Sequence, residues 1–242
     1  MSFASASRSA GTVLRNITHA RHNDFHFRKH WFDWTASHAN DFDVCCLSGD
    51  LLDMLADPNP SLATQIRWVG NWLSSFPARL CVCSGNHDYW RSDERFVDKN
   101  AGSGWLLRQR RKGLLVDGDT EVLGGYLFAC KPWIGPVILP AGRPVVLLAH
   151  GPPEGTVVSS DLGHESGDFE TTALVKQLPE KSIVLSGHVH NPGRWHLIGR
   201  VTIFNPGFAG PEQDAPNHIV IDLERREAEF FGWGRHLGPV RF

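Results

Sequence analysis

Short apolar runs, each followed closely by a Gly, Asp, Asn or His, recur along this chain. They hold four residues or fewer, rich in Val, Leu, Ile and Cys, and occupy residues 44–47, 80–83, 145–148 and 183–185. Runs this short that stop at turn-forming residues are typical of buried β-strands, since helices usually need about ten residues or more. We therefore expect four buried strands here.

Segments with helical spacing separate these runs. An aromatic stripe recurs at helical spacing within residues 27–40, and an aliphatic stripe does so within residues 62–76. Further helices are predicted within residues 89–112 and over residues 169–178, the latter capped by Asp168. Strands that alternate with helices predict crossover connections, so the strands on either side of such a helix should run parallel.

Glycine-containing dipeptides predict antiparallel pairing in the middle of the chain. Asp117-Gly118 and Gly124-Gly125 separate the apolar runs 114–116, 121–123 and 126–130. Dipeptides of this kind favour hairpin turns, so the three runs are expected to form an antiparallel meander.

The arrangement of predicted elements indicates an α/β (α+β) protein. Two C-terminal runs, 219–221 and 228–231, predict one more hairpin. No internal repeat or low-complexity linker divides the chain. We therefore expect one domain over residues 12–242, in which two sheets pack face to face and are flanked by helices, after a loose leader of residues 1–11.

Composition excludes several classes of protein. The chain has 242 residues, of which 41% are apolar and 21% charged, with a net charge of -2. Such a composition argues against disorder, and a nearly neutral chain has no field to hold nucleic acid or an anionic membrane. No apolar stretch is long enough to span a bilayer, and residues 1–11 do not resemble a secretory signal. The five cysteines suit core positions in a reducing compartment, so we expect a cytoplasmic protein.

Side chains with metal-binding atoms follow each of the four apolar runs. They are Asp50 and Asp53, then Asn86, His87 and Asp88, then His150, and last His188 and His190. Ligands of open α/β sheets bind at the carboxyl ends of the strands. Several Asp and His side chains buried there without partners would be costly, so a bound cation is the economical explanation.

The first strand, within residues 12–20, leaves two candidates for a fifth group. His19 ends that strand without a carboxylate nearby, whereas Asp24 precedes His26 by two residues. Residues two apart lie on the same side of an extended segment, so we choose Asp24 and His26. His19 and His22 are interpreted as strand or loop residues.

Five motifs thus follow one another in a fixed order. They are Asp24-x-His26, Gly49-Asp50-x-x-Asp53, Gly85-Asn86-His87-Asp88, His150-Gly151-Pro152-Pro153 and Gly187-His188-x-His190. This ordered set resembles the calcineurin-like metallophosphoesterase superfamily, and with the flanking strands the resemblance covers nearly the whole chain. It implies a four-layer αββα sandwich, in which two mixed β-sheets pack face to face between helices.

The resemblance also implies a binuclear metal centre. One ion would be held by Asp24, His26, Asp50 and His190, and the other by Asp50, Asn86, His150 and His188. Mixed carboxylate and imidazole ligands suit Mn, Fe or Zn, with Mn expected. The implied reaction is hydrolysis of a phosphate ester, most readily a phosphodiester, by a hydroxide that bridges two divalent ions.

The remaining motif residues would act on the substrate. In the family His87 is not a ligand; it would face the phosphate and protonate the leaving oxygen or stabilise developing charge. Asp88 would orient the His87 ring.

Departures from the family pattern argue against two branches of this superfamily. The first motif follows Arg21, His22 and Asn23 where apolar residues and a Ser are usual. The second motif lacks an Asp-Arg-Gly continuation, and the third ends in Asp88 where protein Ser/Thr phosphatases have Glu. These differences argue against that phosphatase branch, and the nearly neutral charge argues against the double-strand-break repair nucleases.

The alternative is a scaffold that keeps the fold and binds partners, as a retromer subunit does. Such members tend to lose the third-motif His or metal ligands, whereas here His87 and all seven ligands are present. We therefore expect an enzyme whose partner is a small phosphoester, with no membrane or nucleic acid. Loops 132–144 and 154–167 would select the substrate, and residues 132–135 could reach the site. The roles of Asp161 and His164 and the oligomeric state stay open.

Overall fold

The structure is a computed structural model. It describes residues 15–19, 25–54, 60–89, 104–161, 163–190, 194–207, 210, 212–232 and 235–242. Within these ranges, residues 15–19, 161 and 235–237 are described by their backbone alone.

The first sheet has seven strands in the order β15-β14-β13-β1-β2-β3-β4. Its strands are β1 (Arg15–His19), β2 (Val44–Ser48), β3 (Leu80–Cys83), β4 (Leu114–Leu115), β13 (His218–Asp222), β14 (Glu227–Gly232) and β15 (Arg235–Arg241). The pairs among β1, β2, β3 and β4 are parallel, and the pairs from β1 outward through β13 to β15 are antiparallel. The predicted hairpin of residues 219–221 and 228–231 is therefore confirmed.

The second sheet has six strands in the order β11-β12-β10-β7-β6-β5. Its strands are β5 (Thr120–Leu123), β6 (Tyr126–Cys130), β7 (Val145–Leu148), β10 (Ile183–Leu185), β11 (Trp195–Ile198) and β12 (Val201–Phe204). The central strands β6, β7, β10 and β12 run parallel, and both edge strands are antiparallel to their neighbours. A small separate ribbon pairs β8 (Ser160–Asp161) with β9 (His164–Glu165).

Four α-helices and two 3₁₀ turns connect these strands in the described part of the chain. They are α1 (Lys29–His38), η1 (Ala39–Asp41), α2 (Leu62–Ser75), η2 (Asn86–Asp88), α3 (Gly104–Leu107) and α4 (Phe169–Val175). The Asp168 carboxylate caps α4 as predicted, since it accepts hydrogen bonds from the Glu170 and Thr171 amides. None of these helices is both long and apolar enough to cross a membrane.

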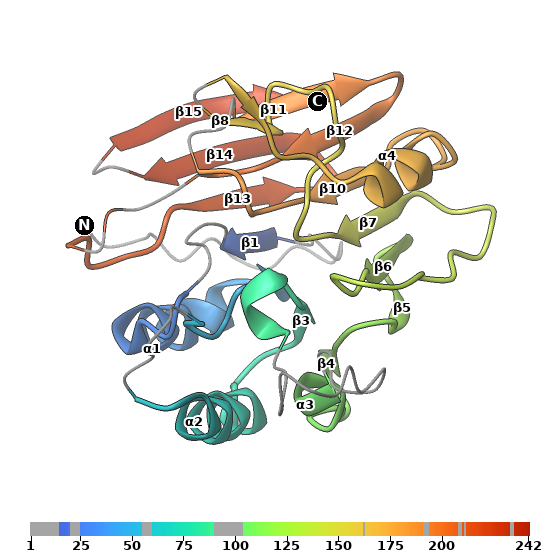
Figure 1. The fold of residues 1–242 in the computed structure, drawn as a ribbon. Helices are drawn as coiled ribbons and strands as arrows, with labels where there is room; N and C mark the ends of the chain where they lie inside the picture. Colours follow the sequence, from blue (N-terminus) through green and yellow to red (C-terminus); the bar gives the residue numbers. More distant parts are fainter. Residues whose placement is uncertain are drawn as a thin grey trace.

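Three apolar clusters show that the molecule has four layers. One cluster lies between α1, α2 and α3 and the first sheet, with Phe32, Leu73 and Leu47 among its members. A second lies between the two sheets, and a third joins the outer face of the second sheet to α4. In Figure 1, α1, α2 and α3 lie together at the bottom, and α4 lies apart from them at the upper right. The predicted αββα sandwich of two mixed sheets is confirmed.

Alternation along each central strand produces these layers. In β2 the Cys45 and Leu47 side chains face the helices, whereas Val44 and Cys46 face the second sheet. Side chains of a strand alternate between its two faces, so a strand that is buried on both faces is apolar throughout. All five cysteines are buried thiols, as the composition predicted.

The predicted meander of residues 114–130 is partly wrong. β5 and β6 form the expected hairpin around Gly124 and Gly125, but β4 pairs with β3 in the other sheet. Residues 116–119 therefore cross between sheets instead of turning back. The Asp117 carboxylate accepts a hydrogen bond from the Ser84 amide at 2.7 Å, which fixes this crossover beside the end of β3.

Candidate metal centre

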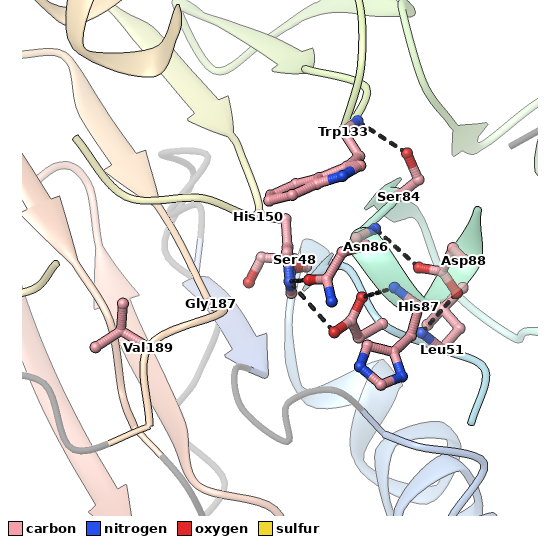
Figure 2. Close-up of polar contacts among 12 residues, drawn as sticks. Ser48, Leu51, Ser84, Asn86, His87, Asp88, Trp133, His150, Gly187 and Val189 are labelled. Atoms are coloured by element: carbon pink, nitrogen blue, oxygen red, sulfur yellow. Dashed lines mark hydrogen bonds and ion pairs between the residues drawn. The ribbon is translucent and has the colours of Figure 1, made fainter. Parts of the chain in front are cut away.

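The candidate residues gather where parallel strands of both sheets end. Gly49 and Asp50 follow β2, η2 follows β3, His150 follows β7, and His188 follows β10. Parallel strands place their carboxyl ends at one edge of a sheet, and β2 and β3 lie against β7. The loops that carry the motifs therefore meet, as Figure 2 shows.

Two glycines allow these loops to approach closely. A Cβ at Gly49, where φ is +96°, would lie 2.5 Å from the His150 Nδ1 atom. A Cβ at Gly85 would lie 2.6 Å from the Asp50 backbone nitrogen and would overlap the Asp50 carboxylate. Only glycine fits at either position without a shift of the neighbouring loop.

The Asp50 carboxylate is buried at the centre of the site. Its Oδ1 accepts a hydrogen bond from the His87 backbone N–H at 2.7 Å, and its Oδ2 lies 3.3 Å from His150 Nε2. Burial opposes ionisation, but the adjacent His150 ring lowers the pKa of Asp50 below its ordinary value. Asp50 is therefore ionised, and each of its carboxylate oxygens has a nitrogen neighbour.

The His150 ring has a defined tautomer. Its Nδ1 lies 2.7 Å from the Ser48 carbonyl oxygen, which can only accept, so Nδ1 carries the proton and donates. Its Nε2 faces Asn86 Oδ1 at 3.0 Å as well as Asp50 Oδ2. Burial opposes a charged ring, but Asp50 raises the pKa of His150 above its ordinary value. Two oxygens that face one ring nitrogen require a cation at that point, either a proton or a metal ion.

Asp50 also belongs to a cluster with His26 and His87. Ligand atoms of His26, Asp50 and His87 all lie within 4.8 Å of one another. The His26 and His87 rings meet edge to face, with centroids 4.4 Å apart. Burial lowers the pKa of His26 to about 4, so its imidazole is neutral at physiological pH and can bind a metal ion.

Two further predicted ligands, His188 and His190, follow β10. The His188 ring centroid lies 5.1 Å from that of His150, and burial lowers the pKa of His188 to about 4. His190 lies two residues further along the same loop and is half-buried. His188 therefore joins the Asn86 side of the site.

The donors present fit divalent transition-metal ions. Neutral imidazoles, one carboxylate and one amide oxygen converge, which is a set that Mn, Fe and Zn accept. Backbone conformation supports the same interpretation: His26, Asp50 and His188 all have positive φ, at 33°, 51° and 62°. Residues other than glycine rarely adopt positive φ, and such backbone strain concentrates at functional sites.

Several predicted residues lie outside the described part of the chain. Asp24 and His22 are among them, and His19 ends β1 but only its backbone is described. The choice of Asp24 over His19 therefore remains a prediction. The structure does bring His26 beside Asp50. His164 is exposed on β9, and the side chain of Asp161 is not described.

The Asp88 carboxylate connects two of the motif loops. Its carboxylate is fully buried and accepts hydrogen bonds from the backbone amides of Leu51, Leu52 and Gly85, at 2.8, 3.1 and 2.9 Å. Burial and the neighbouring Asp50 raise the pKa of Asp88, and these amide donors oppose the rise. Both oxygens accept from backbone amides, so Asp88 joins the second and third motif loops, and its role in orienting the His87 ring stays a prediction.

Two supporting side chains were missed by the sequence analysis. Ser84 Oγ accepts a hydrogen bond from the Trp133 amide, and the buried Lys131 ammonium forms ion pairs with Asp168 and Glu170. The only sign of this ion pair in the sequence was the lysine that directly follows the apolar run 126–130. The expectation that residues 132–135 reach the site is confirmed, because the Trp133 ring packs against His150.

Comparison with known proteins identifies the family of the chain. The family model for calcineurin-like phosphoesterases matches residues 18–192. TT1561 of Thermus thermophilus is 16% identical, with a TM-score of 0.59 over 91% of this chain and 99% of that one. YfcE, a phosphoesterase from E. coli, is 13% identical, with a TM-score of 0.46 over 94% of this chain and 98% of that one. No curated protein matches. On the family match, which covers most of its length and all five motifs, the chain belongs to the calcineurin-like phosphoesterase family.

Proposed function

We propose that this phosphoesterase binds two divalent transition-metal ions and hydrolyses a small phosphodiester. The observation that carries the proposal is the position of Asp50. Its carboxylate contacts His150, whose ring also faces Asn86, and it belongs as well to the cluster with His26 and His87. A carboxylate shared in this way is suited to bridge two cations.

The ligand sets of the proposal follow the family pattern. Asp24, His26, Asp50 and His190 would hold one ion, and Asp50, Asn86, His150 and His188 the other. When bound, such a pair of ions neutralises phosphate charge and lowers the pKa of the attacking water. Manganese is the proposed metal, with iron or zinc as the alternatives.

The protein's own groups then orient the reactants. The Ser48 carbonyl holds His150 in the tautomer whose Nε2 can bind a cation. Asp88 fixes the loop that carries Asn86 and His87 through three amide hydrogen bonds. We propose that His87 donates a proton or a hydrogen bond to the leaving oxygen of the ester.

The proposal keeps the location and partners expected from the sequence. A cytoplasmic protein acting on a small phosphoester agrees with the net charge of -2 and with five buried thiols. A nearly neutral chain lacks the field that retains nucleic acid. The proposal accordingly includes neither a nucleic acid nor a membrane as partner.

The test combines metal analysis with activity. Purified protein reconstituted with manganese should hold two ions per chain and hydrolyse bis-p-nitrophenyl phosphate faster than p-nitrophenyl phosphate. Excess chelator should abolish turnover. One ion per chain, or activity that survives chelation, would contradict the two-metal proposal, and a faster monoester reaction would contradict the substrate class. Bound metal without any hydrolysis would favour the scaffold alternative.

A matched pair of substitutions makes the test specific. Asp50→Asn removes the shared charge and should lower both metal content and kcat, the latter by more than about 1,000-fold. Asp43→Asn makes the same chemical change at an exposed position before β2 and should alter neither. Equal metal content in the two variants would show that Asp50 does not bridge.

A further inference from the structure

Trp133 lies beside the proposed phosphate site although no motif contains it. It follows β6 by three residues, and β6 runs parallel to β7, so both strands end at the edge where the motif loops meet. The Trp133 ring centroid lies 5.4 Å from that of His150 and 5.3 Å from that of His188. Figure 2 shows the indole extended above His150.

The loop that carries Trp133 is anchored on both sides. The Trp133 amide donates a hydrogen bond to Ser84 Oγ at 3.0 Å, which connects it to the third motif loop. Two residues earlier, the Lys131 side chain is 3% exposed, and its ammonium lies 3.1 Å from carboxylate oxygens of both Asp168 and Glu170. A buried ammonium with two carboxylate partners holds the start of the loop in place. The indole is therefore fixed relative to the site.

Only part of the indole is covered by protein. A Cβ at Gly151 would lie 3.4 Å from its Cζ3 atom, so the six-membered ring packs over Gly151 and the two histidines. The residue as a whole is half-buried. Trp133 is therefore partly exposed while its ring contacts His150 and His188, two of the side chains proposed to hold a metal ion.

The same loop exposes more apolar surface. Ile134, the next residue, is 59% exposed, and Ile138 is 83% exposed, while Val137 between them is buried and holds the loop down. The loop that carries Trp133 thus presents further exposed apolar surface, and Ile134 directly follows Trp133 in the chain.

We propose that Trp133 is a specificity-determining residue that stacks on a planar aromatic group esterified to the phosphate. The substrate class is then an aryl or nucleoside phosphoester and not a purely alkyl one. This inference rests on the proposed function, because it needs a phosphate at the metal site. Stacking of this kind contributes affinity without base-specific hydrogen bonds.

The experiment measures binding, so it does not depend on turnover. Calorimetry on manganese-loaded protein compares methylphosphonate, cyclohexylphosphonate and phenylphosphonate, which share the anionic group and are not hydrolysed. Phenylphosphonate should bind about 10-fold more tightly than methylphosphonate. Cyclohexylphosphonate, which is apolar but not flat, should gain about threefold or less. A fourth ligand, adenosine 5′-monophosphate, distinguishes the two kinds of aromatic ester. If it binds more tightly than phenylphosphonate, the substrate is a nucleoside ester, and if it binds more weakly, the substrate is an aryl ester.

Variants assign the effect to the indole. Trp133→Leu should reduce the phenyl preference, measured as the ratio of phenylphosphonate to methylphosphonate affinity on samples of known metal content, to less than about twofold, whereas Trp133→Phe should retain most of it. Val122→Ala removes an exposed apolar side chain on β5, near the opposite end of the sheet, and should change nothing. A phenyl preference that persists in Trp133→Leu would overturn the inference. Failure of every phosphonate to bind metal-loaded protein would instead overturn the proposed function.

Discussion

Replacing His87 with Ala should separate catalysis from metal binding. The His87 backbone N–H donates to Asp50, while its side chain lies beside His26. The Met54 amide lies 3.4 Å from His87 Nδ1, which indicates that Nδ1 accepts and that the proton sits on Nε2. An Nε2–H group can donate to a leaving oxygen, so we expect His87→Ala to retain both metal ions and to lose rate.

The expected loss of rate in His87→Ala follows from the proposed role of His87 as a general acid. A positioned general acid contributes about 10²–10⁴-fold, which corresponds to about 3–5 kcal/mol of barrier. The loss should depend on the leaving group, because p-nitrophenolate needs little protonation whereas an alkoxide needs much more. We therefore expect the loss to lie near the lower limit for p-nitrophenyl esters and near the upper limit for alkyl or nucleoside esters.

The assay is steady-state kinetics on both ester types, with metal content measured on the same samples. His196→Ala on β11 provides a matched control and should keep full activity. Equal losses on both esters would remove the general-acid role and leave electrostatic stabilisation. Loss of an ion would make His87 a ligand, which is a real alternative because its ring lies within the His26 and Asp50 cluster.

Three further predictions test close packing and burial in the structure. Gly85→Ala should displace Asp50 and reduce metal content, whereas Gly104→Ala in α3, where nothing lies within 4 Å of an added Cβ, should bind metal normally; equal occupancy would refute the close packing. Lys131→Met removes a buried charge from two carboxylates and should lower the free energy of unfolding by about 3 kcal/mol in urea titrations, an effect that an unchanged midpoint would disprove. Burial lowers the pKa of His218 to about 4. As pH falls from 6.5 to 4, His218 therefore takes up a proton in the unfolded chain but not in the native state, and the free energy of unfolding should fall by up to about 3 kcal/mol. His218→Gln should abolish this part of the pH dependence, and parallel stability curves for the two proteins would count against it.

The sequence by itself determined the positions of most elements and motifs. Each apolar run that ends at Asp50, Asn86, His150 or His188 forms a strand, because alternation and turn residues act locally. The ordered motifs then identified the family and its four layers. The first motif is the exception, since β1 ends at His19 and Asp24 lies outside the described residues.

The tertiary structure decided which distant segments meet. Nothing near Leu114 in the chain indicates that it pairs with β3 and not with β5, because strand partners are selected by packing between layers. The sequence likewise places Asp88 next to His87, yet its carboxylate binds amides about 36 residues away along the chain, because a buried carboxylate needs several N–H donors. Trp133 reaches His150 and His188 only because β6 and β7 are parallel neighbours, a pairing that no local pattern encodes.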